Sequence, residues 1–382
     1  MSNLREVLTS HTDRGTAPGA VALVARGDRV EVEAVGTVDV EGTAPMRRDS
    51  IFRLTSVTKP ITAAAVMALV DDGKIAWDDP IAKWIPELAN PMVVRDPTGP
   101  IDDVEPADRP ITVFDLLTFR AGWGFPSGPG FPAAAGVFAL ARHVLQPLKA
   151  EPVDTWVEEL SRIPLLYQPG RAWLYGTGSV LQGVLVARAT GQRLGDFMSE
   201  RIFAPLGMKD TGFFVPRDKR DQFTSLYTPN EDGGLDLVDA PDGQWSADPR
   251  FHSGAGGLVS TVDDWWAFAR MMLGEGTLDG KRILSRESVR DMTTNHLTAG
   301  QRAEIEVFTE GQGWGFGGTV DVDDRDPWTV PGRYGWVGGT GVTAHLTPST
   351  RDVVILLTQR CSMGAAPTEM MRDVWRYAAQ AG

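Results

Sequence analysis

Strand-forming segments lie at both ends of this 382-residue chain, with helix-forming sequence between them. Near the start, residues 20–35 comprise an apolar run, a turn and a run in which apolar and polar side chains alternate, which is typical of a β-hairpin with one face in water. Near the end, 341–346 and 352–359 have strand-like sequence on either side of a Thr-Pro-Ser turn. We therefore expect the two ends of the chain to share one antiparallel sheet.

The last predicted strand contains an uninterrupted apolar run, 353–357, which is typical of a strand covered on both faces. Helices should therefore pack on both sides of the sheet, including one over 368–379. Further helix-like segments lie at 61–70, 113–117, 137–148, 155–160, 180–190 and 194–203. We predict an α+β protein, an α/β sandwich domain of residues 1–85 and 240–382 with a mostly helical domain of residues 86–239 inserted. Ligand sites commonly lie in a crevice between two such lobes.

Charge and composition narrow the class of protein. The sum of 37 basic and 50 acidic residues is −13, and this field repels phosphate backbones and anionic lipid, so we expect neither a nucleic-acid nor a membrane partner. The longest apolar stretch, 63–70, is too short for a bilayer span, and no secretory signal is visible at the start. A single cysteine, Cys361, excludes an internal disulfide and is interpreted as a packed thiol. These features predict a cytoplasmic protein.

The densest chemical signal is the segment 52–61, in which Ser56 and Lys59 are three residues apart. On a helix the two side chains share one face, and Pro60 is tolerated only near a helix start, so Ser56 should lie at or just before the first turn. A serine hydroxyl becomes a good nucleophile when a base takes its proton, and a buried lysine with a lowered pKa can do this. A helix-capping serine followed by a surface lysine is the alternative interpretation.

Two further segments carry groups that suit the same chemistry. Tyr175 follows a Pro-Gly turn and precedes a helix-like segment, where its phenol can relay a proton, although a tyrosine that only fills a helix–loop junction fits equally well. Glycines within 335–341 lead into a predicted strand, and there a substrate can approach backbone N–H groups that hold an oxyanion. Alone, glycines before a strand usually mark a turn.

In this order and spacing, the three elements resemble the serine β-lactamase and penicillin-binding-protein superfamily, with its S-x-x-K and K-T-G signatures. The chain is most similar to the class C β-lactamase-like branch called family VIII carboxylesterases. Other similarities run nearly end to end: L-L-T-F-R-A-G at 116–122, G-A-G-G-L-V-S-T at 254–261 and L-D-G-K-R-I-L at 278–284. The resemblance implies a β-lactamase/transpeptidase-like fold.

The resemblance also implies a role for individual residues. Ser56 would be the acylated nucleophile, and Lys59 and Tyr175 would be the proton-transfer pair. Backbone N–H groups of Ser56 and Gly339 would form the oxyanion hole, with Gly338 beside them in the substrate-binding strand. No metal or organic cofactor is implied.

Two departures from the lactamase pattern favour ester substrates. Trp336 stands where the lactamases have a lysine, and a neutral indole cannot pair with the carboxylate of a β-lactam. Thr177 replaces an asparagine whose amide would bind a lactam side chain. Trp123 and Phe125 lie in a Gly-rich stretch and are candidates for the wall of an apolar acyl pocket, although aromatic residues in such loops more often anchor the loop. The sequence thus predicts a carboxylesterase that acts on a small-molecule ester.

Other functions remain open at this point. A β-lactamase, a D-peptidase or an amide hydrolase would use the same scaffold, and a non-catalytic penicillin-recognising protein would keep the fold alone. A Ser-His-Asp triad would leave Lys59 and Tyr175 without a role. No complete G-x-S-x-G motif, phosphate loop or zinc-type histidine spacing occurs. The natural substrate and the oligomeric state, monomer or homo-oligomer, do not follow from the sequence.

Overall fold

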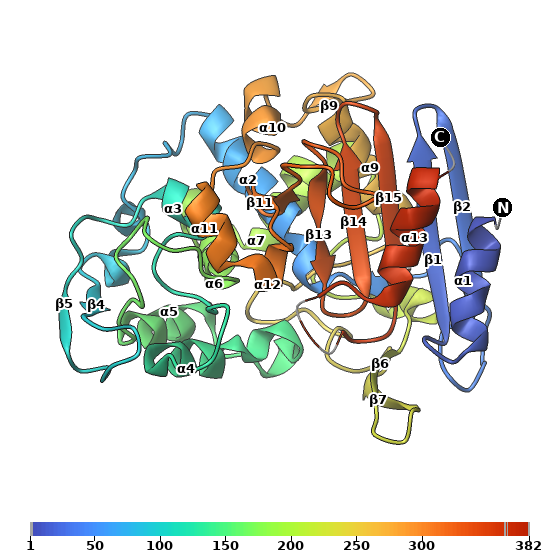
Figure 1. Ribbon diagram of the computed structural model, residues 1–382, viewed down its shortest axis with the longest axis horizontal. Coiled ribbons are helices and arrows are strands. Elements are labelled where there is room, and N and C mark those ends of the chain that lie inside the picture. The colour runs from blue at the N-terminus through green and yellow to red at the C-terminus, as the bar shows by residue number, and fades with distance from the viewer. Residues whose placement is uncertain (1–2, 363, 365, 381–382) are drawn as a thin grey trace.

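The computed structural model describes residues 3–362, 364 and 366–380. Within these residues, the centre of the fold is a seven-stranded antiparallel sheet in the order β11-β12-β13-β14-β15-β1-β2 (Figure 1). Its strands are β1 (Gly19–Arg26), β2 (Arg29–Gly36), β11 (Gly313–Trp314), β12 (Thr319–Val320), β13 (Tyr334–Gly338), β14 (Val342–Thr347) and β15 (Asp352–Thr358). The prediction that both ends of the chain build one sheet is confirmed.

The two ends of the chain join where β1 pairs with β15, with Ala20 opposite Thr358 and Ala25 opposite Val353. Alternate side chains of these strands enter two separate apolar clusters, one on each face of the sheet. On one face lie α1 (Leu4–Asp13) and α13 (Glu369–Gln380), which Figure 1 shows beside the strands near the two termini. On the other face lie α2 (Lys59–Asp71) and α9 (Val262–Leu273). This confirms the expectation of helices on both faces.

Residues 86–239 hold most of the remaining helices, and Figure 1 shows α4 and α5 at a distance from the sheet. The elements are α3 (Val113–Leu117), α4 (Pro132–Ala139), α5 (Val153–Ser161), α6 (Thr177–Thr190), α7 (Leu194–Met198) and α8 (Ala204–Leu206), with hairpins β4 (Met92–Val94)/β5 (Val104–Pro106) and β6 (Leu226–Pro229)/β7 (Leu235–Asp239). The remaining elements are β3 (Phe52–Arg53), which pairs with β8 (Val259–Ser260), β9 (Thr277–Leu278), β10 (Lys281–Arg282), α10 (Arg286–Met292), α11 (Ala299–Glu304) and α12 (Glu306–Thr309).

Two predicted helices differ in the structure. The helix expected over 137–148 is already formed from Pro132 as α4 and ends at Ala139, and short 3-10 turns follow. Pro147 accounts only for the absence of helix up to residue 148, because a proline disfavours helical backbone in the residue before it and lacks an N–H of its own, and it does not explain the end of α4 at Ala139. The helix expected over 194–203 is α7 continued by a π-helical stretch. No described helix is long and apolar enough to cross a bilayer.

Candidate active site

Ser56 lies in a single 3-10 turn, η1 (Thr55–Thr58), directly before α2. Pro60 falls in the first turn of α2, where its missing N–H leaves no helical bond unmade. Lys59 begins α2, and its side chain lies beside η1 so that Nζ is 2.9 Å from Ser56 Oγ. The sequence prediction of a serine at a helix start with a lysine next to it is therefore met by the local structure.

The Lys59 side chain is buried, with 2% of its surface exposed. Its Nζ donates to Ser56 Oγ and, over 2.6 Å, to the backbone carbonyl of Ala255. Burial lowers the pKa of Lys59 from 10.5 to about 7. Near neutral pH a substantial fraction of Lys59 is therefore an uncharged amine, which can accept the proton of Ser56.

Tyr175 is the second side chain that reaches Ser56, and its ring centroid lies 4.7 Å from Lys59 Nζ. Its Oη donates to Ser56 Oγ over 2.7 Å and accepts a 2.8 Å hydrogen bond from the indole Nε1 of Trp336. Burial raises the pKa of Tyr175 to about 12, although both hydrogen bonds act in the opposite direction. The phenol thus stays protonated at neutral pH and is placed to donate. Backbone bonds of 2.9 and 3.0 Å to Phe125 hold Tyr175 in position before α6.

The turn between β13 and β14 packs against the backbone that leads to Ser56. Thr340 Oγ1 donates to the carbonyl of Arg53 over 2.6 Å, and Thr340 N donates to Thr55 Oγ1 over 3.3 Å. A Cβ at Gly338 would lie 2.6 Å from the carbonyl oxygen of Leu54, so only glycine permits this approach. The contact brings Gly339 and Ser56 to the same cavity, as the proposed oxyanion hole requires.

Thr55, the residue before the nucleophile candidate, has a φ of +40°. This backbone conformation is rare for a β-branched residue and costs about 1–3 kcal/mol. The hydroxyls of Thr55 and Thr340 lie 3.1 Å apart, so the same contact that aligns the turn also holds the strained residue. Strain of this kind is frequent at functional sites.

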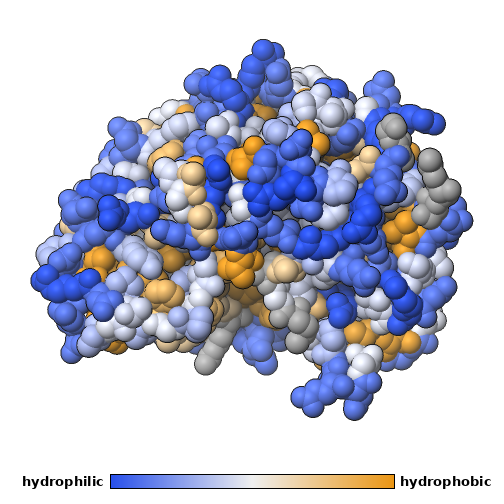
Figure 2. Space-filling model, viewed as in Figure 1, coloured by the Kyte–Doolittle hydropathy of each residue, from blue (hydrophilic) through white to orange (hydrophobic). Residues whose placement is uncertain are grey.

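A small cavity of about 140 Å³ opens at Ser56. Its wall combines aromatic and aliphatic side chains with glycine backbone: Tyr175, Phe308, Trp336, Val337, Gly338, Gly339, Ser362, Gly364, Ala366 and Met371. Phe308 belongs to α12 and stacks on Tyr175 with 5.2 Å between ring centroids. Figure 2 shows a largely hydrophilic face with apolar groups gathered at α12 above a hollow. The cavity thus suits a small ligand with little charge.

Three predicted substrate-binding residues lie outside the wall of this cavity. Trp123 is buried in the main apolar cluster and donates from Nε1 to the carbonyl of Ile163 over 2.8 Å. Phe125 pairs by its backbone with Tyr175, but its ring stacks on Phe138. Thr177 is buried at the start of α6. Trp336 and Gly338, in contrast, line the cavity.

Sequence reasoning did not single out Ala255, Phe308 or Thr340. The carbonyl of Ala255 accepts a hydrogen bond from Lys59. The loop that carries Ala255 passes close to α6, because a Cβ at Gly254 would lie only 2.4 Å from Ser179 O. The glycines within 254–261 could have predicted that this loop packs closely against another element. No local sequence pattern indicates that Phe308 lies at the site.

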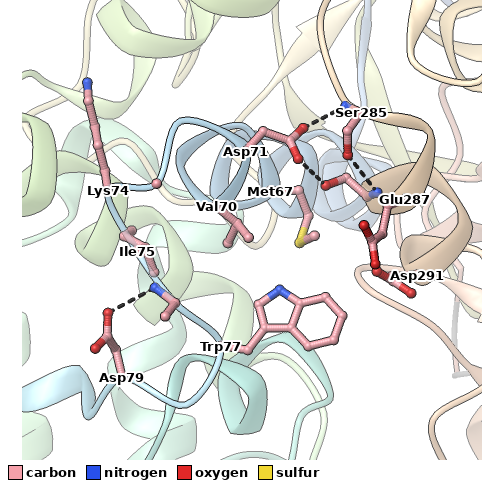
Figure 3. A pocket seen from close by; sticks show the side chains of 13 residues that line it. Met67, Val70, Asp71, Lys74, Ile75, Trp77, Asp79, Ser285, Glu287 and Asp291 are labelled. Carbon is pink, nitrogen blue, oxygen red and sulfur yellow. Dashed lines mark hydrogen bonds between the residues drawn. The ribbon is translucent and has the colours of Figure 1, made fainter.

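A larger cavity, of about 730 Å³, lies between α2 and α10 (Figure 3). Its carboxylates hold the chain in place: Asp71 accepts hydrogen bonds from Ser285 N at 2.6 Å and Ser288 Oγ at 2.7 Å, and Asp79 accepts one from Ala76 N at 2.9 Å. The lysine of this wall, Lys74, lies apart from Ser285 in Figure 3. In the part of the chain that the structure describes, no three metal-ligating side chains gather at a potential metal site.

Comparisons with known proteins identify the family of this chain. A family model described as Beta-lactamase matches residues 4–378. Protein Rv1367c of Mycobacterium tuberculosis is 37% identical over 371 residues, which cover 94% of this chain and 89% of that protein. Esterase EstB of Burkholderia gladioli is 32% identical over 381 residues, which cover 93% of this chain and 90% of that one.

One solved structure is described as EstCE1, a hydrolase with promiscuous acyltransferase activity. It has a TM-score of 0.83 at 23% identity, and the match covers 98% of this chain and 96% of that chain. The chain belongs to the Beta-lactamase family, and it is a hydrolase of the β-lactamase fold. The predicted fold class is confirmed.

Proposed function

We propose that this protein hydrolyses small carboxylic esters through an acyl intermediate on Ser56. One observation carries the proposal: Ser56 Oγ lies 2.9 Å from the amine of Lys59 and 2.7 Å from the phenol of Tyr175. An uncharged amine and a protonated phenol on the same hydroxyl supply the base and the acid that acyl transfer needs.

In the acylation step, Lys59 Nζ takes the proton of Ser56 while Oγ forms a bond to the ester carbonyl carbon. The negative charge moves to the carbonyl oxygen, where backbone N–H groups of Ser56 and Gly339 stabilise it. When the tetrahedral intermediate collapses, the bond to the alcohol oxygen breaks, and Tyr175 donates its proton to that oxygen.

Deacylation reverses these roles. The Tyr175 phenolate takes a proton from water, and the hydroxide attacks the acyl carbon. The bond to Ser56 Oγ then breaks, and the Lys59 ammonium returns its proton to Oγ. Both residues finish in their starting protonation states, and one water is consumed for each ester cleaved.

The preference for an ester over a β-lactam rests on Trp336. Its indole nitrogen is engaged with Tyr175, so position 336 offers neither a cation nor a free donor to the carboxylate of a lactam. Aromatic and aliphatic side chains form much of the cavity wall. The similarity to EstB, which is described as an esterase, adds weaker support at 32% identity.

Covalent labelling tests the nucleophile. An organophosphonate should add to the wild-type protein and give a single adduct by intact mass, and Ser56→Ala should give none. Ser362→Ala is the matched control, because Ser362 lines the same cavity and lies outside the proposed proton-transfer pair. Undiminished labelling of Ser56→Ala would refute the assignment.

Substrate class is tested with the same protein. A nitrophenyl ester of a short acid should be turned over faster than nitrocefin or a D-alanyl peptide. A much faster reaction with either of these would replace the esterase proposal by a β-lactamase or peptidase function. Absence of any acyl adduct across the panel would instead indicate a non-catalytic relative.

A further inference from the structure

A third cavity, of about 240 Å³, lies on the face of the sheet that α13 covers, and it shares no wall residue with the cavity at Ser56. It is enclosed by the ends of β1, β14 and β15, by α13 and by the loop before β13. Its apolar surface includes Trp328, Val354 and Trp375. Its charged groups are Arg26, Arg333 and Asp352.

Arg333 is buried in this wall with few partners. It is 6% exposed, and its side chain makes one hydrogen bond to the described residues, a long one of 3.4 Å from Nη1 to Asp321 Oδ2. Nη2 of Arg333 and the indole Nε1 of Trp375 have no hydrogen-bond partner in the part of the chain that the structure describes. A guanidinium has five N–H donors, and leaving them unpaired in a buried place is costly.

The neighbouring charges do not remove this deficit. Asp321 accepts a hydrogen bond from Val330 N at 3.2 Å and reaches only Nη1 of Arg333, at 3.4 Å, so it leaves Nη2 of the guanidinium unpaired. Arg26 is committed to the end of α13, donating to the carbonyls of Ala378 at 3.1 Å and Tyr377 at 3.3 Å. Arg333 is therefore the cation in this wall that keeps unpaired N–H donors.

Asp352 also reaches the cavity and would repel an anion placed next to it. Its carboxylate is partly exposed and accepts a hydrogen bond from Thr350 Oγ1 at 2.7 Å. Arg333 lies on the loop before β13 and Asp352 at the start of β15, two strands away in the sheet. The anionic end of a ligand belongs on the Arg333 side.

We propose that this cavity binds a small carboxylate with an apolar body, of the size of benzoate. The carboxylate accepts from the Arg333 guanidinium, whose planar fork suits that group, and the apolar body packs against Trp328, Val354 and Trp375. The volume equals roughly eight water molecules at liquid density, enough for one such ligand. The apolar walls disfavour an inorganic anion.

The test is binding of 4-fluorobenzoate, followed by fluorine NMR, with the neutral isostere 4-fluorobenzamide and inorganic phosphate as comparisons. We expect the benzoate to bind at least tenfold more tightly than the amide, and phosphate to compete poorly. No step of this measurement requires hydrolysis, so its outcome is independent of whether Ser56 cleaves esters.

Two variants locate the ligand. Arg333→Gln removes the cation, and Ala379→Trp fills the cavity from an exposed position on α13. Each should weaken benzoate binding at least tenfold, whereas Arg29→Gln, an exposed arginine at the start of β2, should leave it unchanged. If Arg333→Gln fails to fold, Ala379→Trp and the amide comparison decide. Equal binding of acid and amide, binding that survives Ala379→Trp, or no binding at millimolar concentration would each overturn the proposal.

Discussion

At the scale of single residues, burial moves the pKa values of the two proposed proton carriers in opposite directions. The pKa of Lys59 falls to about 7 and that of Tyr175 rises to about 12, because burial disfavours the charged form of each. The amine is thereby suited to act as base and the phenol as acid. The sequence identified both residues but could not show which one acts as base and which as acid, because that assignment depends on burial and not on spacing.

The pH dependence of kcat/KM should report Lys59. The base form of Lys59 is the unprotonated one, so activity should rise with pH through about 7 and level off above it. With this pKa, kcat/KM at pH 6 should be about tenfold below its plateau. Initial rates with a nitrophenyl ester, corrected for spontaneous hydrolysis, measure the profile between pH 5.5 and 9. A flat profile across this range would remove Lys59 as the base.

Replacing Trp336 by phenylalanine should weaken the acid. The variant keeps an aromatic ring but loses the 2.8 Å hydrogen bond from Nε1 to Tyr175 Oη, which favours the phenolate that forms when Tyr175 donates. A hydrogen bond of this kind is worth about 1 kcal/mol, so kcat for an ethyl ester should fall about fivefold. A nitrophenolate leaves without protonation, and its ester should be affected little. Equal losses for the two esters would contradict this role.

At the scale of elements, local sequence patterns predicted several helices and strands correctly, but they did not predict the features that depend on packing between elements. The hairpin β1–β2, strand β15 and the start of α2 followed from periodicity and from one proline. The wall contributed by Phe308 did not, because α12 is a short helix that reaches the cavity only through tertiary packing. The break after α4 was also missed, since an apolar run alone does not show where a helix stops.

The turn between β13 and β14 should be sensitive to a single hydroxyl. Thr340→Val keeps the shape but removes the bond that Oγ1 donates to the carbonyl of Arg53 and the bond that Oγ1 accepts from Thr55 Oγ1. We expect unfolding free energy to fall by about 1–3 kcal/mol and kcat to fall further than stability requires, because Gly339 loses its alignment with Ser56. Urea unfolding and ester turnover measure the two effects.

Thr319→Val is the matched control for this change. Its buried hydroxyl donates to the carbonyl of Gly335 over 3.0 Å, away from the turn. It should lose comparable stability while kcat stays near the wild-type value. If both variants lose activity in proportion to stability, the hydroxyl of Thr340 only supports the fold.

At the scale of the whole molecule, the catalytic arrangement depends on parts that are far apart in the sequence. Ser56 and Lys59 come from the start of α2, Tyr175 precedes α6, and Trp336 belongs to β13. The sheet that holds β13 is completed only when β1 from the chain start pairs with β15 from its end. The site can therefore form only once the fold is complete, and part of the cost of forming it is the burial of one amine.

That cost should appear in the stability of the protein. The pKa of Lys59 is about 7 in the folded protein and 10.5 in the unfolded chain, so the unfolded chain binds more protons between these values, and this group makes stability rise with pH across that window. Below pH 7 the full penalty of a buried ammonium is present. Lys59→Met abolishes it, and the stability gained relative to wild type should shrink by on the order of 4 kcal/mol between pH 6 and pH 10. Lost hydrogen bonds to Ser56 and Ala255 shift this difference equally at every pH.

Urea unfolding at pH 6, 8 and 10 measures the stability difference between Lys59→Met and wild type, with the exposed Lys74→Met as the control whose difference stays constant. Parallel stability curves for wild type and Lys59→Met would mean that Lys59 carries its charge inside the fold at no cost, and it could not then serve as the base at neutral pH.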